Sequence, residues 1–596
     1  MLSYRKLAMR VLGRPLHTEG IDSPRPASQR AAAFILTVAM LTTRAAPAFA
    51  GTWYIEDGNI TISAGTEAGT NKVEQVGKDT VNNDKDTVIT NREDKASSHT
   101  VTIETNDKND TVEVTLKDVN IDASSRNNAA VSVTGSGNTT IKLDGDNALK
   151  SDTYRSGIYG SGSLTISGGE NDSLTAQGGS GADGIYGSGS LTISGGTVTA
   201  NGDDGGRGIS SRGGVTISGG STVTANGGNG TISGGDGICS SGGVTISGGS
   251  TVTANGGNGG SIGGGSGIYS NGSVTISGGT VTANGGKGGS GYGGDGIRSL
   301  DHVAISGGTV TANGGNSTNS SGGYGIISLD VAISSGTVTA NGGDSKDGYG
   351  GDGIHSNGVT ISSGTVNAAG GYGGKVGGYG ICSFDRVAIS GGTVEAAGGN
   401  GSTGGGSGIY SSVIDLSGSL ELTAKAGSPT GKALLQNGRE LDLDTIKDKL
   451  GPGAKVTATD ANGKTKQVSV PRPVEPEEPV IPEESSSSSD GGSATPSAPV
   501  SPLPGLTVTD KSGAVISYTS TQSGNTLTVC VGRLTASFRI SLAALRQLRA
   551  EGIETITFQT ILCSTTLSVD ELLAMGGEDA EAVLTHRFTD SSLTVG

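Results

Sequence analysis

A Gly-Ile pair recurs through the middle of the chain at a nearly constant interval, and this repeat constrains the fold more than any other feature. The mean interval is about 28 residues, the length of one structural unit in several repeat folds. Each unit holds short runs in which apolar and polar residues alternate, as in Val274-Thr275-Ile276. Such alternation predicts β-strands with one buried face. The isoleucine of the pair stands at Ile158, Ile185, Ile209, Ile238, Ile268, Ile297, Ile326, Ile354, Ile381 and Ile409.

The three runs in each repeat are too short for long hairpins, and no helix-length segment separates them for β-α-β crossovers. If each repeat is one coil of a right-handed parallel β-helix, every strand pairs with its equivalent in the next coil, about 4.8 Å away. Glycine accounts for 109 of the 596 residues and marks the corners between runs. We therefore predict an all-β solenoid with about ten coils at residues 157–425. The longer Gly-rich stretches should bulge from one edge of the coils.

An asparagine follows Thr-Ala and precedes Gly in six successive repeats. At a tight corner, an asparagine tolerates left-handed backbone and can hydrogen-bond to its equivalents in the coils above and below. We interpret this column as a structural ladder that ends where alanine replaces asparagine, at Ala369 and Ala397. Its members are Asn201, Asn226, Asn255, Asn284, Asn313 and Asn341.

The segments on either side of the repeats differ from them in composition. Residues 51–156 keep the alternation but carry more charge and larger apolar residues, which predicts irregular coils and an N-terminal cap. Residues 426–470 should form a C-terminal cap that includes a short helix at LDTIKDKL. Residues 471–505 are a Pro/Glu/Ser-rich linker. Residues 506–596 combine strand-like and helix-like runs, which predicts a small α+β domain.

The first fifty residues have the pattern of an export signal. Arg25 and Arg30 precede the apolar run AAAFILTVAM, and Ala48-Phe49-Ala50 provides a small-x-small cleavage site. We expect residues 1–50 to be a signal peptide and the protein to be secreted or at the cell surface. No integral membrane domain is expected after cleavage; retention of the apolar run as an anchor is the alternative. Export would permit a disulfide between Cys530 and Cys563, the alternative being two buried thiols.

The net charge and the histidine content argue against two classes of function, nucleic-acid binding and catalysis. The formal net charge is −16, and removal of seven basic and two acidic residues with the signal peptide would lower it to −21. An acidic chain without clustered Lys and Arg argues against nucleic-acid binding. The four histidines after residue 50 show neither His-x-His nor His-Glu-x-x-His spacing. No nucleophile-base constellation is recognisable, so we expect a protein that is not an enzyme.

An acidic residue stands directly before the Gly-Ile pair in alternate coils. These are Asp183, Asp236, Asp295 and Asp352. Residues in alternate coils would lie about 10 Å apart along one edge. Calcium prefers such oxygen ligands, supplemented by backbone carbonyls of glycine loops. The column therefore predicts calcium as a candidate cofactor with these four metal ligands; the alternative is that the aspartates cap the backbone.

The position after each isoleucine should face outward by strand parity. Aromatic rings at such positions can stack on sugars, and a guanidinium can add hydrogen bonds. The alternative is that these side chains merely shield the coil surface. The residues predicted to bind a ligand in this column are Tyr159, Tyr186, Tyr269, Arg298 and Tyr410.

The segments TVEVTLKDVNIDA, TTIKLDGDNALKS and GIYGSGSLTISGG, within about residues 95–200, resemble the secreted carbohydrate-binding β-helix family of clostridia and other gut Firmicutes. The resemblance implies a right-handed β-helix that binds an acidic plant polysaccharide, polygalacturonate, together with calcium. The TISGGTVTANGG array that follows is similar to adhesin repeats. None of the family's calcium ligands can be matched residue by residue, so the four aspartates depend on their own spacing.

Three functional hypotheses follow. The leading one is a non-catalytic exported protein that binds a polysaccharide along one face of the helix, with calcium as a bridge to an acidic polymer. The second is a cell-surface adhesin or spacer whose partner is a cell-surface or host protein. The third is a lyase of the pectate type, which needs an Arg or Lys base beside clustered calcium aspartates; Arg298 next to Asp295 meets this requirement only nominally.

Overall fold

The computed structural model describes residues 51–471, 505–510, 514–516, 518–523, 525–531, 535–560, 564–575, 580–586 and 591–595. The predicted signal peptide lies outside the described residues, as does the predicted linker except for its two end residues. The chain divides into two compact units, Met1–Glu475 and Pro476–Gly596. None of the described helices is long and apolar enough to cross a membrane.

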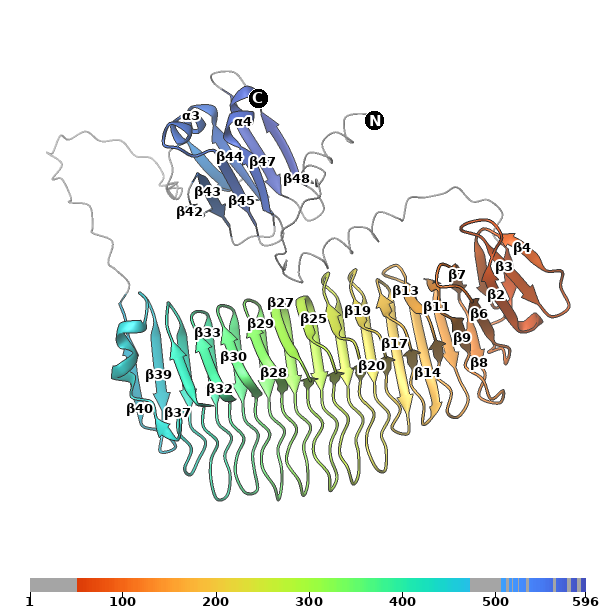
Figure 1. The fold of residues 1–596 in the computed structure, drawn as a ribbon, viewed down its shortest axis with the longest axis horizontal. Helices are drawn as coiled ribbons and strands as arrows, with labels where there is room; N and C mark the ends of the chain where they lie inside the picture. Colours follow the sequence, from red (N-terminus) through yellow and green to blue (C-terminus); the bar gives the residue numbers. More distant parts are fainter. Residues whose placement is uncertain are drawn as a thin grey trace, which may run out of the picture. The chain divides into compact units, whose positions relative to one another are not determined.

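The first unit is a parallel β-helix of about 15 turns, as the repeat predicts (Figure 1). Each repeat coil contributes one strand, or part of one, to each of three stacks of parallel strands. Within a stack, each residue pairs with the equivalent residue of the next coil, as in Ile238↔Ile268 and Ile268↔Ile297. The first stack contains the strands that begin at the isoleucine of the Gly-Ile pair: β12 (Ile158–Gly160), β15 (Ile185–Gly187), β18 (Ile209–Ser211), β21 (Ile238–Ser240), β24 (Ile268–Ser270), β26 (Ile297–Ser299), β28 (Ile326–Ile333), β30 (Ile354–Ile361), β32 (Ile381–Ile389) and β34 (Ile409–Ser411).

The other two stacks follow in the same order within each coil. The second contains β13 (Ser163–Ser167), β16 (Leu191–Ile193), β19 (Val215–Ile217), β22 (Val244–Ile246) and β35 (Val413–Leu416), together with parts of β25, β27, β28, β30 and β32. The third contains β14 (Ser173–Ser180), β17 (Thr197–Asp203), β20 (Thr222–Asn226), β23 (Thr251–Asn255), β25 (Val274–Asn284), β27 (His302–Asn313), β29 (Thr337–Asn341), β31 (Thr365–Ala369), β33 (Thr393–Ala397) and β36 (Glu421–Lys425).

The core is built from columns of identical small apolar residues. In one coil, Ile268, Val274, Ile276, Val281 and Ala283 are all fully buried. Burying one such Ile or Val contributes about 1.5–3 kcal/mol, and the same contribution recurs coil after coil. A coil with three short strands encloses only a narrow interior, which explains why branched aliphatic residues and alanine fill it.

The asparagine ladder is confirmed. The Nδ2 of each asparagine donates to the Oδ1 of its equivalent in the preceding coil, at 2.8–2.9 Å, from Asn341 back to Asn201. The ladder ends where Asn341 meets Ala369 in register. These bonds fix the register of the third stack, since a slip of one residue would unpair every amide.

Both ends of the helix are capped by antiparallel pairs. At the N-terminal end, β2–β3 and β3–β4 are antiparallel, while β9, β10 and β11 continue the three stacks. At the C-terminal end, β37–β38 and β39–β40 are antiparallel, and the expected helix is the 3-10 helix η2. The elements are β1 (Thr52–Tyr54), η1 (Ile55–Asp57), β2 (Ile60–Ala64), β3 (Asn71–Gln75), β4 (Val81–Asp84), β5 (Thr87–Thr90), β6 (Val101–Thr105), β7 (Thr111–Lys117), β8 (Asn120–Asp122), β9 (Val131–Gly135), β10 (Asn138–Asp144), β11 (Asp146–Lys150), β37 (Leu434–Gln436), β38 (Arg439–Glu440), η2 (Leu443–Lys449), β39 (Lys455–Thr459) and β40 (Thr465–Ser469).

The Gly-rich stretches leave one edge of the helix as long loops, as expected (Figure 1). They are not irregular bulges, because each loop pairs with the next in register, as in Gly259↔Gly288 and Gly288↔Ser317. Backbone bonds connect them further: the N–H of Gly294 donates to the carbonyl oxygen of Gly286 at 2.9 Å. A Cβ on Gly294 would lie only 1.9 Å from the carbonyl oxygen of Gly265. Close approach of backbone to backbone therefore requires glycine here.

The second unit is the predicted α+β domain. Its described residues form two four-stranded sheets, β41-β44-β47-β48 and β42-β43-β45-β46, and two short helices. The hydroxyl of Ser541 accepts from the N–H of Ala544 and caps α3. Cys530 ends β43 as a free cysteine whose Sγ donates to Oε1 of Gln559 at 3.5 Å, and Cys563 lies outside the described residues, so the structure does not support the predicted disulfide. The elements are β41 (Leu506–Thr509), β42 (Thr519–Ser523), β43 (Thr526–Cys530), β44 (Ala536–Ser541), α3 (Leu542–Ala550), β45 (Thr555–Gln559), β46 (Ser564–Ser568), α4 (Val569–Met575), β47 (Glu581–His586) and β48 (Ser591–Val595).

Candidate functional site

The five residues predicted to bind a ligand lie in one column along the first stack. Tyr159 pairs in register with Tyr186, Tyr269 pairs with Arg298, and Tyr410 follows Cys382. The structure therefore brings together two pairs and leaves Tyr410 apart from both. Tyr410 stacks on Tyr379 instead, with ring centroids 5.2 Å apart.

Not every residue of this column is exposed, although none of its cysteines belongs to the hydrophobic core. Ser210, Cys239 and Cys382 in the same column are buried, and the exposed fraction of Cys382 is only 3%. Small side chains in a column of equivalent residues are less exposed than large ones, since larger neighbours above and below extend past them. Tyr159 is exposed, whereas the other four predicted residues are half-buried.

Tyr159 and Tyr186 form a stacked pair. Their ring centroids are 5.4 Å apart and their planes differ by 11°, close to the coil spacing. The rings therefore stand across the axis of the rod, one above the other. Their inner faces cover each other. The outer face of Tyr159 points toward the preceding coil, where its register partner is the small residue Ser132.

A depression of about 430 Å³ opens beside that outer face. Tyr154 is 78% exposed and has a left-handed backbone with φ +59°, which is uncommon for a bulky residue and typical of functional positions. Arg155 donates to Asn127 at 3.3 Å and has no carboxylate partner among the described residues. The depression is lined by Asn128, Ala129, Ser132, Tyr154, Arg155, Ser156, Tyr159 and Tyr186.

Sequence reasoning found the two stacked tyrosines but missed the rest of this depression. The signal was the aromatic-basic pair Tyr154-Arg155 in the turn before Ile158, a place where other repeats carry mostly Gly and Ser. That turn precedes the regular repeats and falls within residues 51–156, the segment predicted to form irregular coils and an N-terminal cap.

The four aspartates act as caps between coils. The Oδ1 of each aspartate accepts a hydrogen bond from the backbone N–H of the equivalent residue in the next coil. The N–H donors are Arg207 to Asp183 at 2.7 Å, Ser266 to Asp236 at 2.8 Å, Tyr324 to Asp295 at 2.8 Å and Tyr379 to Asp352 at 2.7 Å. One carboxylate thus joins two coils, and alternate spacing holds these charges about 10 Å apart. The structure does not bring the four together, so calcium binding by them stays a prediction.

The second oxygen of most of these carboxylates faces a side-chain donor. Asp236 lies 3.5 Å from Nε of Arg207, Asp295 lies 3.1 Å from Nη1 of Arg298, and Asp352 lies 2.7 Å from Nδ1 of His355. Burial raises the pKa of Asp183, Asp236 and Asp295, while the backbone N–H bonds and the arginines oppose that rise. Burial also raises the pKa of the Cys239 thiol to about 12 and that of the Cys382 thiol above its usual range.

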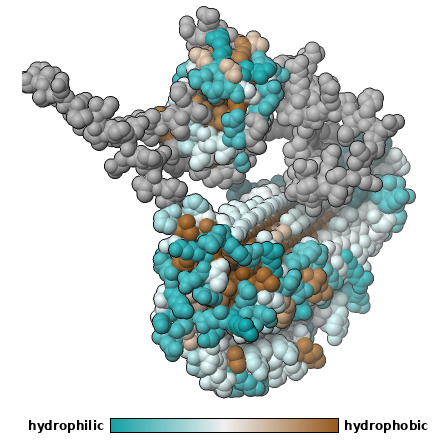
Figure 2. Space-filling model, turned by 60° about the vertical axis from the view of Figure 1, so that its left-hand side comes forward, coloured by the Kyte–Doolittle hydropathy of each residue, from teal (hydrophilic) through white to brown (hydrophobic). Residues whose placement is uncertain are grey.

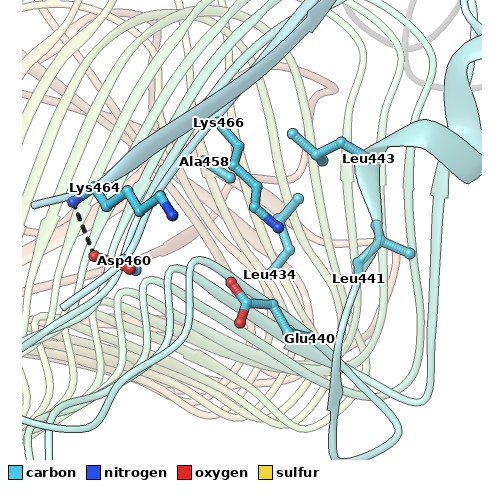
Figure 3. A pocket seen from close by; sticks show the side chains of 8 residues that line it. All are labelled: Leu434, Glu440, Leu441, Leu443, Ala458, Asp460, Lys464 and Lys466. Carbon is cyan, nitrogen blue, oxygen red and sulfur yellow. Dashed lines mark hydrogen bonds between the residues drawn. The ribbon is translucent and has the colours of Figure 1, made fainter. Parts of the chain in front are cut away.

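Other depressions lie elsewhere along the described residues. One of about 360 Å³ lies among glycines beside Asp183, Arg207 and Asp236, and one of about 240 Å³ is lined by residues that include His355 and Phe384. A third, at the C-terminal cap, holds only about 20 Å³, and Figure 3 shows its leucines with charged side chains beside them. That volume is too small for a sugar. It is lined by Leu434, Glu440, Leu441, Leu443, Ala458, Asp460, Lys464 and Lys466.

The surface offers no broad apolar face in the view from the C-terminal cap. Figure 2 shows small hydrophobic patches among hydrophilic residues at that end, and long pale faces of intermediate hydropathy along the rod. No protein-family model, curated protein or solved structure matches this chain.

Proposed function

We propose that this chain is a non-catalytic exported protein that binds a polysaccharide along the first stack of the β-helix, with the depression at Tyr159 as its main contact. The observation that carries the proposal is the uncovered outer face of Tyr159 above Ser132. A pyranose ring placed there would occupy the position that a third tyrosine would take in the preceding coil. The coil spacing of about 4.8 Å lies within the range at which rings stack.

Polar groups around this face suit a sugar. Arg155, Asn128 and the hydroxyl of Ser132 line the depression and can donate hydrogen bonds to ring hydroxyls. An aromatic platform with a few fixed polar groups is the usual composition of a ligand site. The backbone of Tyr154 is held by its N–H, which donates to the carbonyl oxygen of Ser180 at 2.9 Å.

Further contacts along the column would extend the site to a polymer. Tyr269 and Arg298 begin four coils beyond Tyr159, which is about 19 Å along the rod. Calcium enters the proposal as a bridge to an acidic polymer, since the chain itself is acidic. The residues that line the depression at Tyr159 carry neither carboxylate nor imidazole, which supports binding over hydrolysis. Arg298, the candidate lyase base, is paired with Asp295.

The test is a glycan array probed with the full chain, with and without calcium, followed by affinity measurements on the best polysaccharide. Tyr159→Ala should lower affinity at least tenfold, because it removes the stacking platform. The control is Tyr292→Ala, a 64% exposed tyrosine in a glycine loop, which should leave affinity unchanged. Absence of binding to every polysaccharide, or equal affinities of the two variants, would refute the proposal.

A second candidate, a surface adhesin or spacer, is favoured by the ordered glycine loops and the separate C-terminal unit. The loops expose Ile232, Ile262, Tyr292 and Tyr349, side chains that a protein partner could cover. Binding of the full chain to host cells, retained in Tyr159→Ala and lost in a chain with these four positions changed to serine, would support this role over glycan binding.

A further inference from the structure

Three different metal-ligating side chains meet between two coils near the C-terminal end of the β-helix. Asp352 precedes β30, His355 is the second residue of β30, and Cys382 is its register partner in β32. Their ligand atoms all lie within 4.8 Å of one another. Coil stacking creates this cluster, because Cys382 is distant from the other two in the sequence.

Asp352 differs from the equivalent aspartates of earlier coils in the side chain that it faces. Asp236 and Asp295 each face an arginine, as described above. Asp352 is 6% exposed, and its one charge-bearing partner among the described residues is His355. An ionised carboxylate in such a place is costly without a positive charge near it. A divalent cation would provide the charge that arginine provides in the earlier coils.

The surroundings hold the ligand atoms in place. The N–H of Tyr379 fixes one oxygen of Asp352 and leaves the other directed at His355. The His355 ring stacks on Tyr324 at 4.4 Å and contacts Phe384 edge-on at 5.1 Å. Partners that orient the ligands in this way are typical of metal sites.

We propose that Asp352, His355 and Cys382 bind one zinc-type divalent ion, and that a water molecule completes the coordination. Carboxylate, imidazole and thiolate together suit zinc, whereas calcium takes oxygen ligands. His355 is the least buried of the three residues and also lines the depression beside Phe384, whereas Asp352 and Cys382 do not line it. On binding, a bond forms between Sγ and the ion, and the thiol proton is released to solvent.

Zinc binding would require only a small change in the distances between the three ligand atoms. Tetrahedral zinc with ordinary bond lengths places its ligand atoms roughly 3.3–3.8 Å apart. The Asp352 oxygen and Nδ1 of His355 lie 2.7 Å apart and would separate slightly, and all three ligand atoms already lie within 4.8 Å of one another. Parallel pairing fixes the backbone of both coils, so the ligand atoms would move by rotations within the side chains.

The experiment uses the full chain freed of metal and titrated with Co²⁺, which reports its ligands spectroscopically. We expect one equivalent to bind, with visible bands of tetrahedral cobalt and a near-ultraviolet thiolate-to-cobalt band, both displaced by Zn²⁺. Cys382→Ala should lose the thiolate band. The matched control is Cys239→Ala, which removes a buried thiol from the same column beside Asp236 and should keep it.

A second variant keeps the proposal testable if Cys382→Ala fails to fold. His355→Gln retains the thiolate but should weaken zinc binding at least tenfold, and zinc should raise the melting temperature of the unchanged chain more than that of the variant. Absence of a thiolate band in the unchanged chain, or unaltered zinc affinity in His355→Gln, would overturn the proposal. Neither result bears on glycan binding, whose depression at Tyr159 lies several coils away.

Discussion

Replacement of a single glycine in the ordered loops should destabilise the β-helix far more than replacement of a glycine at a nearby corner. Gly294 and Gly278 belong to the same repeat. A Cβ on Gly294 would lie 1.9 Å from the carbonyl oxygen of Gly265, whereas a Cβ on Gly278 would meet nothing within 4 Å. Gly294→Ala and Gly278→Ala therefore add the same methyl group to two very different environments.

The loss of unfolding free energy in Gly294→Ala can be estimated from the distance by which neighbouring loops must separate. The clash at Gly294 is with backbone, and a contact of at least 3.0 Å requires neighbouring loops to separate by about 1.1 Å. Bonds such as those from Gly286 to Gly265 at 2.8 Å and from Gly315 to Gly294 at 2.7 Å would then be too long to persist. Loss of about three bonds at about 1 kcal/mol each, with strain of about 1–3 kcal/mol, gives about 4–6 kcal/mol.

Urea unfolding followed by circular dichroism and amide hydrogen exchange would measure the two variants. Repeat arrays depart from two-state unfolding, so exchange in the loops is the more local readout. Gly294→Ala should lose protection in its own loop and in the two adjoining loops. Gly278→Ala should stay within about 0.5 kcal/mol of the unchanged chain. Equal stability of the two variants would refute the close packing of the glycine loops.

Three further predictions test other parts of the structure. Asn284→Ala breaks two ladder bonds, at 2.9 and 2.8 Å, and should cost about 1–3 kcal/mol in urea unfolding, whereas the exposed Asn271→Ala should cost less than about 0.5 kcal/mol. Asp295→Ala leaves the N–H of Tyr324 and the guanidinium of Arg298 without their acceptor, and a loss below about 1 kcal/mol would contradict the capping role. Burial lowers the pKa of His586, so folding of the C-terminal unit should weaken as pH falls below about 6.5 toward that lowered value; thermal unfolding at about pH 7 and pH 5 should show this weakening, and should show less of it in His586→Gln.

The repeat was enough to predict the fold, the three stacks and the asparagine ladder, because residues at equivalent positions determine the register. Ile268 and its equivalents occupy identical buried positions in every coil. The order of the glycine loops could not be predicted in the same way. Glycine in a sequence indicates conformational freedom, and nothing at Gly294 itself shows that a carbonyl oxygen from the preceding coil lies against it.

The candidate site was predictable only in part. Strand parity places Tyr159 on the surface, but the orientation of its ring depends on Tyr186 in the next coil and on the small Ser132 in the preceding one. The zinc-type cluster depends in the same way on Cys382, which approaches Asp352 through coil stacking alone. Contacts between coils thus decide the chemistry, whereas the pattern within one repeat reveals only which face a residue occupies.

The substitution Ser132→Tyr tests glycan recognition most directly, because it would extend the tyrosine stack and fill the space beside Tyr159. The new ring should stack as Tyr159 and Tyr186 do, at about the coil spacing, so the fold should be retained. Affinity for the best polysaccharide of the array, measured by titration calorimetry on the full chain, should fall at least tenfold. Unchanged affinity in a folded Ser132→Tyr chain would show that sugars do not bind at the outer face of Tyr159.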